Sequence, residues 1–392
     1  MDRIKVMHVL TDTNVGGAGT LLYNTLRCGD TGRFDYVVVL PNGSRLVERF
    51  SSLACRVLTV EAGRDRSMCW RDIPRFIKVI REERPDILHA HSALSARIAA
   101  RMCRVPVCIQ TRHCVFPLKP WQKNALFRAG VRLGSRMLSD QVVAVAEAAK
   151  QNLLELGVDG RQIQVIINGV LPVRRCEEAE VAQLRHRLGL SEEHFVVGMP
   201  ARLEEYKGQG TVIRAAARCV AHYPEFRFLL IGDGGCLLPY QALARELGVE
   251  KEVIFVGFVE DMAPYYALMQ VNVNASFGTE TSSLALSEGM SVGVPAVASV
   301  YGGNPKMVVE GENGLLFPIK DETALSERLM RLHEDRGLLA RLSEGALRHY
   351  RERLTATQMV GQLESLYLHL WQGARGSKGR GYKKSLGGSK SY

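Results

Sequence analysis

Two successive series of short apolar strands, each alternating with helical segments, run through most of this 392-residue chain. Most of the strands are continuous runs of β-branched residues, as expected where helices cover both faces of a parallel sheet. The pattern therefore predicts an α/β protein. The first half has predicted strands at 4–10, 36–40, 56–60, 86–91, 107–113, 142–146 and 164–168. The second half has them at 195–201, 226–232, 253–258, 271–276, 295–299 and 314–317.

The length of the chain exceeds the size at which a single core keeps growing, so two domains are expected. A turn and a proline in NGVLPVRR, residues 168–175, follow the last strand of the first half and predict the boundary. We expect the domains at 1–170 and 171–354. Three helical patterns close the chain, at about 321–333, 335–351 and 355–371.

The formal net charge of +10 is concentrated near the C-terminus. The segment 372–392 is rich in Gly and Ser and has no acidic residue. Its basic residues are Arg375, Lys378, Arg380, Lys383, Lys384 and Lys390. Such a segment buries too little apolar surface to fold, so we predict a disordered basic tail whose partner would be anionic.

The sequence indicates neither a membrane-spanning nor a secreted protein. No stretch approaches the roughly 18 apolar residues of a spanning helix. The start, MDRIKVMHVL, lacks the continuous apolar run of a signal peptide. The nine cysteines are scattered without the spacing of a zinc site, so reduced thiols are expected. We therefore predict a cytoplasmic protein.

Two loops that follow strands have the residues of phosphate-binding sites. In TDTNVGGAGTLLYN, Gly16 and Gly17 would let the backbone amides of a helix start approach an anion, although simple tight turning also explains them. In VVGMPARLEEYKGQG, Arg202 and Lys207 lie between a strand and a helix that begins near Gly208. Two cations there suit a diphosphate, whereas a solvated loop would carry them without any function.

The segment SFGTETSSLALSEGMSVGV has the strongest functional pattern. A helix is predicted from Ser283 to about Ser291, so the amides of Ser283 and Leu284 would form a positive helix end that can hold a phosphate. Glu280 precedes this helix and would be free to bind hydroxyl groups. Glu288 lies in an otherwise apolar helix, where a carboxylate needs a hydrogen-bonding partner such as a ribose diol. Alternatively, Glu280 is only a charge near the N-terminus of the helix, and Glu288 is only an exposed helix residue.

Three histidines lie at the ends of two predicted strands, in DILHAHS and IQTRHC. His89, His91 and His113 would thus lie at the sheet edge where open α/β sheets bind ligands. Metal binding is disfavoured because no carboxylate or thiol recurs at ligand spacing. His113, beside Arg112, is the strongest candidate, although a single histidine is more often a packed or surface residue.

The segment 119–138, KPWQKNALFRAGVRLGSRML, predicts a basic amphipathic helix. Arg128, Arg132 and Arg136 recur at every fourth position, and like charges on one face repel rather than stabilise a helix. With Trp121 and Lys123, and with apolar residues on the other faces, this helix suits an anionic bilayer or a lipid diphosphate acceptor. A solvated face of an ordinary packed helix is the alternative. Nucleic acid is disfavoured because no aromatic platform accompanies the charges.

Taken together, these segments resemble the GT-B glycosyltransferases and, within them, glycosyltransferase family 4, from residue 4 to about 371. The motifs that carry the resemblance are GGAG, TRH, AVAEAAKQNLLELGV with VIINGV, ARLEEYKG, IGDGG, VGFVEDM and ETSSLALSE. The resemblance implies two Rossmann-like doubly wound domains facing across a cleft, with helix 355–371 crossing back to the N-terminal domain. It implies retaining transfer from a nucleotide sugar held by the C-terminal domain, without a metal or another cofactor.

The resemblance also implies roles for matching residues. Arg202 and Lys207 would hold the diphosphate, Glu288 the ribose and Glu280 the transferred sugar. His113 would touch the donor sugar, while the leaving phosphate oxygen takes the acceptor proton. Further donor-binding positions would be Gly16, Gly17, Gly234, Phe258, Ser283 and Leu284. Many relatives have EGFGL where this chain has ETSSL, so the resemblance does not extend to the sugar preferred.

The resemblance and the basic surface together predict a hexosyl- or N-acetylhexosaminyltransferase that uses a UDP-sugar. Its expected acceptor is a lipid-linked saccharide in cell-surface polysaccharide or glycolipid synthesis, at the cytoplasmic face of a membrane. Three alternatives stay open. One is a sugar-nucleotide epimerase of GT-B architecture, another is a non-catalytic nucleotide-sugar-binding partner protein, and the third is a soluble transferase that glycosylates proteins.

Overall fold

The computed structural model describes residues 3–13, 16–62 and 65–385, with side chains to residue 375 in the last helix. The chain folds into two compact units. Unit 1 comprises Met1–His113, Pro117–Gly169 and Ala356–Tyr392, and unit 2 comprises Cys114–Phe116 and Val170–Thr355. None of the described helices combines the length and the apolar composition needed to span a membrane.

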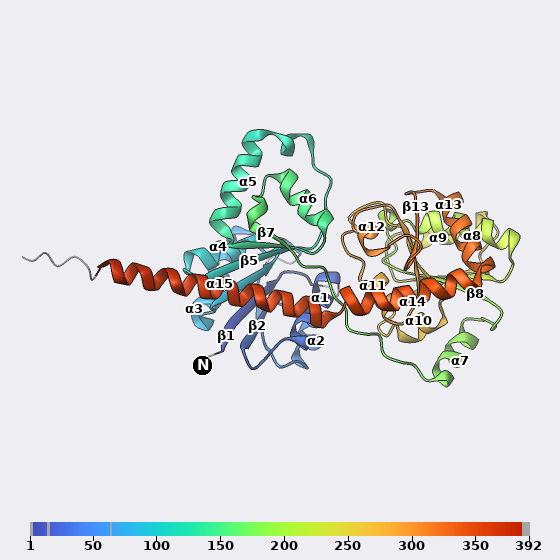
Figure 1. The fold of residues 1–392 in the computed structure, drawn as a ribbon, viewed down its shortest axis with the longest axis horizontal. Helices are drawn as coiled ribbons and strands as arrows, with labels where there is room; N and C mark the ends of the chain where they lie inside the picture. The colour runs from blue at the N-terminus through green and yellow to red at the C-terminus, as the bar shows by residue number, and fades with distance from the viewer. Residues whose placement is uncertain (1–2, 14–15, 63–64, 386–392) are drawn as a thin grey trace, which may run out of the picture. The chain divides into compact units, whose positions relative to one another are not determined.

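Unit 1 is built on a parallel sheet with the strand order β3-β2-β1-β4-β5-β6-β7 (Figure 1). Its strands are β1 (Ile4–Leu10), β2 (Phe34–Pro41), β3 (Arg56–Val60), β4 (Ile87–His91), β5 (Val107–Arg112), β6 (Gln141–Ala144) and β7 (Ile163–Val165). Each coincides with or overlaps a strand predicted from an apolar run, so that prediction is confirmed. The order reverses between β1 and β4, and ligands of open α/β sheets bind beyond the carboxyl ends of the strands at such a point.

Helices cover both faces of the sheet in unit 1. Side chains of α1, α2 and α15 pack on one face, and those of α3 and α4 pack on the other. The helices are α1 (Gly17–Cys28), α2 (Leu46–Ser51), α3 (Ile73–Glu83), α4 (Leu94–Met102), α5 (Ala125–Leu138), α6 (Glu147–Leu156) and α15 (Ala356–Ser385). Short 3₁₀ turns occur at Trp70–Asp72, Pro120–Lys123 and Gly160–Gln162. Side chains alternate between the two faces, so His8 shares a face with Val6 and Leu10.

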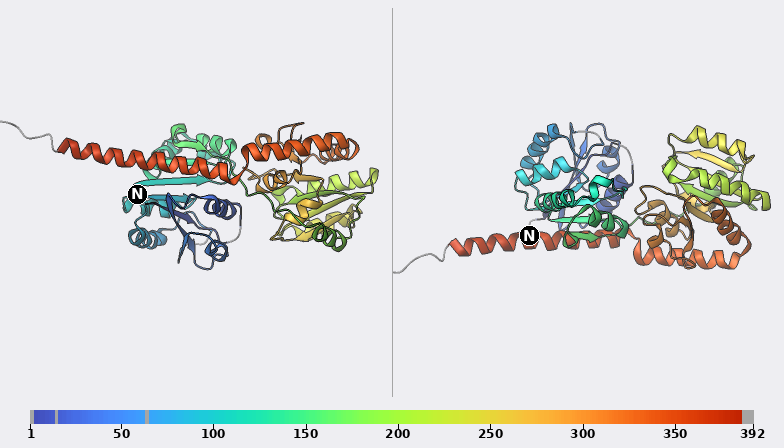
Figure 2. Two further views of the ribbon diagram at one scale, coloured as in Figure 1. Left: turned by 60° about the horizontal axis from the view of Figure 1, so that its bottom comes forward. Right: turned by 90° about the horizontal axis from the view of Figure 1, so that it is seen from above.

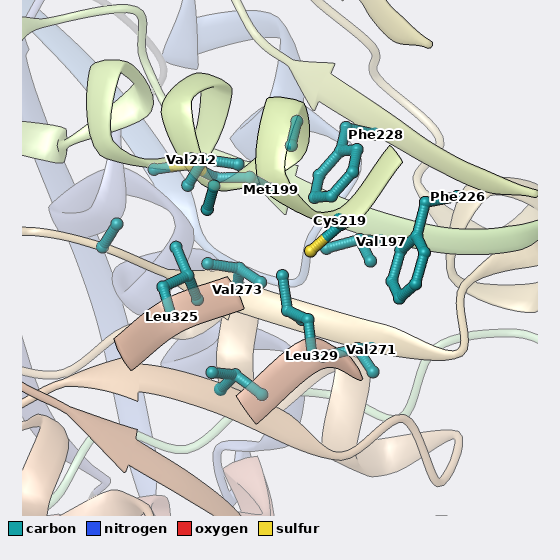
Figure 3. Packing of buried hydrophobic residues seen from close by; sticks show 14 of the residues in the cluster. Val197, Met199, Val212, Cys219, Phe226, Phe228, Val271, Val273, Leu325 and Leu329 are labelled. Atoms are coloured by element: carbon teal, nitrogen blue, oxygen red, sulfur yellow. The ribbon is translucent and has the colours of Figure 1, made fainter. Parts of the chain in front are cut away.

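Unit 2 has a second parallel sheet with the order β10-β9-β8-β11-β12-β13. Its strands are β8 (Phe195–Pro200), β9 (Phe226–Ile231), β10 (Val253–Gly257), β11 (Val271–Asn274), β12 (Ala296–Ser299) and β13 (Gly314–Phe317). Its helices are α7 (Glu178–Arg187), α8 (Gln209–His222), α9 (Leu237–Glu246), α10 (Ala263–Leu268), α11 (Leu284–Ser291), α12 (Asn304–Met307), α13 (Glu322–Glu334) and α14 (Arg336–Arg353), and Glu205–Lys207 forms a 3₁₀ turn. Figure 3 shows Cys219 of α8 and Leu329 of α13 packing in the main core of this unit.

The last helix, α15, belongs to unit 1 although the chain reaches it from unit 2. Its buried residues Met359, Val360, Leu363, Leu366 and Tyr367 pack on the sheet of unit 1, and Figure 2 shows the helix running along that unit. The helix continues to Ser385, beyond the predicted end at residue 371. It therefore enters the segment that we expected to be disordered, because each residue added to an existing helix gains a hydrogen bond without a new nucleus. Residues 386–392 of the predicted tail lie outside the described residues.

Candidate active site

An ion pair between Lys207 and Glu280 lies at the centre of the candidate site in unit 2. Nζ of Lys207 is 3.0 Å from Oε2 of Glu280, and the same oxygen accepts hydrogen bonds from Asn274 Nδ2 (3.1 Å) and Ser276 Oγ (2.9 Å). The glutamate is only 6% exposed. Burial alone would raise the pKa of Glu280, but the neighbouring Lys207 charge and the three hydrogen bonds outweigh it and lower that pKa.

This arrangement differs from the expectation that Glu280 would be free to bind a ligand. A buried carboxylate is costly unless it is paired, and Lys207 supplies the cation from a turn 73 residues earlier in the sequence. One oxygen of the carboxylate takes all three of these hydrogen bonds. The group is therefore held in one orientation before any ligand arrives.

The loops around this ion pair approach one another too closely for side chains at two glycines. Gly208, next to Lys207, has a positive φ of 83°, and a Cβ there would lie 2.1 Å from the carbonyl oxygen of Ala275. Gly234 follows β9, and a Cβ there would lie 2.3 Å from the carbonyl oxygen of Leu203. Gly234 thus allows the loop after β9 to lie against the loop after β8, which bears Arg202 and Lys207.

Glu288 is held by a partner that the sequence did not reveal. The hydroxyl of Tyr266 lies 3.0 Å from Oε2 of Glu288 and 3.0 Å from the carbonyl oxygen of Ala285. Tyr266 is fully buried on α10, so the position of this hydroxyl is set by packing. Glu288 lies on α11, which begins at Leu284 with Ser283 as its N-cap, as predicted.

The remaining predicted positions of unit 2 lie on the same loops. The backbone carbonyl of Arg202 accepts a hydrogen bond from Gln209 Nε2, while its guanidinium forms no ion pair with the described residues. The side-chain oxygen of Ser283 caps the amide of Leu286, and the amide of Ser283 itself lies 3.2 Å from Sδ of Met307. Phe258 follows β10 and is 66% exposed, so its ring is available to a ligand.

In unit 1 three histidines form a line of hydrogen-bonded rings on the face of the sheet covered by α1 and α15. Nδ1 of His8 is 3.1 Å from Nε2 of His91, and Nδ1 of His91 is 2.9 Å from Nε2 of His113. His89 lies beside them, with Tyr367 Oη and Thr111 Oγ1 each 2.6 Å from one of its ring nitrogens. His8 was not predicted. It pairs in register with His89, so the strand order β1-β4 was the signal that could have identified it.

Burial keeps the histidines of this cluster uncharged at neutral pH. It lowers the pKa of His8 to about 3, and that of His113 to about 4 with a contribution from Arg112. It also lowers the pKa values of His89 and His91, with neighbouring histidines adding to the effect. His113 is only partly buried and follows Arg112, the last residue of β5.

The nitrogens of His8, His89 and His91 lie within 4.8 Å of one another, a spacing that a metal ion could use. Both ring nitrogens of His89 and of His91, however, already have hydrogen-bond partners inside the protein. A divalent ion would also bring its charge into a fully buried group without any carboxylate. The hydrogen-bonded arrangement accounts for these residues without a metal.

At the same carboxyl edge of the sheet in unit 1, beyond the end of β1, α1 begins at Gly17 with Gly16 as its N-cap. Gly16 is extended, and a Cβ there would meet no atom within 4 Å, so the space beside the helix start is open. Residues 14 and 15 of the preceding loop lie outside the described residues. An open helix start of this kind can accept an anion.

The basic helix begins later than predicted. Asn124 caps α5, and Trp121 and Lys123 lie in the preceding 3₁₀ turn rather than on the helix. The break arises because the extended Asn124 places its side-chain oxygen 2.8 Å from the amide of Leu126. Trp121 still packs edge-on against Phe127, with ring centroids 4.9 Å apart.

No residue of α5 is fully buried, and the helix has two distinct exposed stripes. Leu126, Leu133 and Met137 form an apolar stripe and are 82%, 62% and 63% exposed. Arg128 and Arg132 lie on a separate basic stripe, about 120–160° farther round the helix, and neither forms an ion pair with a described residue. Arg136 was expected to add its charge to this basic side of the helix. It pairs instead with Asp159, which partly neutralises its charge. An open hollow of about 420 Å³ is lined by Ala125, Arg128, Ala129, Arg132, Leu133, Arg136 and Gly157.

Comparison with known proteins gives matches along nearly the whole chain. The model "Glycosyltransferase Family 4" matches residues 15–174, and the model "Glycosyl transferases group 1" matches residues 180–349. The N-acetyl-alpha-D-glucosaminyl L-malate synthase of Bacillus anthracis is 26% identical over 302 residues, which are 75% of this chain and 77% of that protein.

A second relative is the UDP-Gal:alpha-D-GlcNAc-diphosphoundecaprenol alpha-1,3-galactosyltransferase of Escherichia coli. It is 25% identical over 303 residues, which are 75% of this chain and 78% of that protein. Among solved structures, HepE from Anabaena, in complex with UDP and glucose, has a TM-score of 0.80 at 22% identity and covers 93% of this chain and 99% of its own. These likenesses confirm the predicted GT-B fold of two Rossmann-like sheets.

Proposed function

Because this chain belongs to glycosyltransferase family 4, we propose that it transfers a sugar from a UDP-sugar to a lipid-linked saccharide with retention of the anomeric configuration. Its membership of this family makes the chain a glycosyltransferase. The choice of donor and acceptor rests on relatives. The Escherichia coli relative carries both UDP-Gal and a diphosphoundecaprenol acceptor in its name, and HepE was solved with UDP.

The main support for the proposed donor site is the buried Lys207–Glu280 pair. An ammonium group has three donors, so Lys207 can keep Glu280 as a partner while it bonds a diphosphate oxygen. Arg202 on the same loop has no ion-pair partner among the described residues and can add a bidentate contact. Glu288, held by Tyr266, would accept hydrogen bonds from the ribose, and the exposed ring of Phe258 would stack on the uracil.

In the proposed reaction the bond between the anomeric carbon and the phosphate oxygen of UDP breaks. The acceptor oxygen forms a bond to the same face of that carbon, and its proton passes to the departing phosphate oxygen. No protein base is needed for this proton. The residues of the chain would orient the two substrates and stabilise the charge that grows on the diphosphate.

A thermal-shift screen of nucleotide sugars tests the donor site. A UDP-sugar at 100 times its dissociation constant should raise the free energy of unfolding by about 2.7 kcal/mol. We expect this stabilisation in the wild type and its loss in Lys207→Ala, because the variant lacks the cation beside the diphosphate. The matched control is Lys251→Ala, which removes an exposed lysine of the same unit and should keep the full shift.

Two outcomes of the screen would contradict the proposed donor. One is the absence of any shift with UDP or UDP-sugars at millimolar concentration. The other is an equal shift with nucleotide sugars of a different base. If binding occurs, transfer of the labelled sugar into a lipid-extractable product tests the acceptor. A product confined to water-soluble saccharide would contradict the proposed lipid-linked acceptor.

The exposed stripes of α5 support a membrane surface as the place where the acceptor is met. An apolar stripe and a separate basic stripe on one helix are the arrangement of an interfacial helix, with Leu126, Leu133 and Met137 entering the headgroup region. Arg128 and Arg132 would contact anionic headgroups, and the hollow beside them would receive a lipid phosphate. The proposed binding is peripheral and reversible.

Sedimentation with vesicles tests this surface. We expect the wild type to bind vesicles that contain phosphatidylglycerol and not vesicles of phosphatidylcholine alone. Arg128→Ala/Arg132→Ala should bind about 30-fold more weakly, since each arginine near an anionic surface contributes about 1 kcal/mol.

The matched control for the vesicle experiment is Arg214→Ala/Arg218→Ala on α8, an exposed pair with the same spacing and the same loss of charge. An equal loss of binding in this control would mean that net charge, rather than α5, holds the protein at the surface. Unchanged binding of the α5 variant would contradict the proposal that α5 is the membrane-binding surface.

A further inference from the structure

The line of rings from His8 through His91 to His113 connects the interior of unit 1 to the sheet edge. His8 is fully buried, His91 is 4% exposed, and His113 is partly exposed after the end of β5. The three rings are stacked or nearly so, with interplanar angles of 23° and 22° between successive rings. Each contact joins a nitrogen of one ring to a nitrogen of the next, at 3.1 Å and 2.9 Å.

A neutral imidazole carries one N–H and one bare nitrogen, so each contact in this line needs a donor on one side and an acceptor on the other. The middle ring, His91, uses both of its nitrogens. The protons of the whole line must therefore point the same way. They point either outward, toward His113, or inward, toward His8.

The two directions differ in the atom that is left over at the buried end. Nε2 of His8 has no hydrogen-bond partner among the described residues. With the protons pointing inward, this atom would be an N–H donor in the core without an acceptor. With the protons pointing outward, it is only a bare lone pair. Orphaned buried N–H groups are rarer and more costly than unsatisfied acceptors, so the outward direction is favoured.

The surroundings of His8 give no acceptor that would reverse this choice. The rings of His89, Tyr36 and Tyr367 lie 5.1, 6.0 and 6.3 Å from it by their centroids. Both nitrogens of His89 are already bonded elsewhere. The hydroxyl of Tyr36 bonds Glu364, and the hydroxyl of Tyr367 bonds His89. The polar groups around the buried end of the line therefore already have partners of their own.

We propose that His91, supported by His8, is a positioning residue that fixes His113 as the tautomer with its proton on Nδ1. Nε2 of His113 accepts a hydrogen bond from His91, so Nδ1–H is the donor that His113 presents at the sheet edge. Resting on the proposed function, this donor is available to a saccharide oxygen at the carboxyl edge of the sheet in unit 1. A donor from a neutral ring gives that oxygen a hydrogen bond without adding a positive charge.

The burial that lowers the pKa of His113 to about 4 agrees with this role, since the ring stays neutral at physiological pH. A neutral histidine in solution exchanges freely between two tautomers. The contact with His91 removes this freedom before the substrate binds. The residue is thereby preorganised in the same sense as a residue of an oxyanion hole.

Nitrogen NMR of the full-length protein with ¹⁵N-labelled histidine, without any substrate, tests the tautomer directly. We expect the signal that disappears in His113→Gln to show a protonated Nδ1 and a bare Nε2. A protonated Nε2 on His113 would overturn the proposal. Since no nucleotide sugar is present, this result stands or fails independently of the proposed function.

Two variants of His91 that are nearly isosteric with each other test how the tautomer of His113 affects transfer. The amide nitrogen of His91→Asn can replace Nδ1–H as a donor to His113, whereas His91→Asp offers only an acceptor there and forces the proton of His113 onto Nε2. We expect His91→Asn to keep kcat within about tenfold of the wild type and His91→Asp to lose about 100-fold in kcat with little change in KM.

Equal losses of kcat in the two variants, with both folded by circular dichroism, would overturn the role of His91. If His91→Asp does not fold, the tautomer of His113 measured in the wild type and in His91→Asn still decides the proposal. If the wild type transfers no sugar at all, the proposed function fails while the NMR result still decides the tautomer.

Discussion

Replacing Glu280 by glutamine is expected to lower kcat/KM for sugar transfer by about 10- to 150-fold. In the wild type, Oε2 accepts from Lys207, Asn274 and Ser276. An amide nitrogen cannot accept, so glutamine must turn its oxygen toward these three donors. Its NH₂ group then stands where the other carboxylate oxygen was. The sugar hydroxyls would meet a neutral donor in place of an anionic acceptor, and a hydrogen bond to a charged group is worth about 1.5–3 kcal/mol.

The glutamine variant should remain folded, because its oxygen still satisfies the ammonium of Lys207. Glu250→Gln is the matched control, since it makes the same chemical change at an exposed position of the same unit. Initial rates at several donor concentrations give kcat and KM for both variants. Transfer by Glu280→Gln within tenfold of the wild type would remove Glu280 from the proposed site. A wild type that binds UDP-sugar but transfers none would favour the alternative of a non-catalytic partner protein.

The strands of both sheets could be predicted from the sequence because a parallel strand covered on both faces must be apolar along its length. The runs YVVVL and FRFLLI are short and mostly apolar, as strands buried on both faces are. The start of α11 could also be predicted, because Ser283 gives a local N-cap signal. Signals of this kind lie within a few residues of one another and need no knowledge of tertiary structure.

The contacts that give the candidate site its chemistry could not be predicted in this way. Lys207 and Glu280 are 73 positions apart, and only the packing of the loop after β11 against Gly208 brings them together. His8 is one of two polar residues in β1, and its importance follows from the strand order that places β1 beside β4. The late start of α5 depends on the backbone angle at Asn124, which the helical pattern of its arginines conceals.

The free energy of unfolding of unit 1 is expected to fall as the pH is lowered from 6.5 toward 4. Burial holds the pKa of His8 at about 3 and that of His113 at about 4, and those of His89 and His91 are also lowered. The unfolded chain, with histidine pKa values near 6.5, then binds more protons than the folded protein. The stability is fully present above pH 6.5 and is lost as the pH falls toward the folded values. His113 alone would account for about 3 kcal/mol, and coupling prevents the four contributions from simply adding.

Tryptophan fluorescence can follow this loss in the full chain, because Trp70, Trp121 and Trp371 all lie in unit 1. Urea unfolding at pH values from 7.5 to 5 isolates the histidines, since most carboxylates titrate below that range. Each histidine that titrates contributes a slope of up to about 1.4 kcal/mol per pH unit, so His8→Phe should lower the slope. A flat dependence in the wild type would mean that the cluster binds protons in the folded protein as readily as in the unfolded chain, and the lowered histidine pKa values would be contradicted.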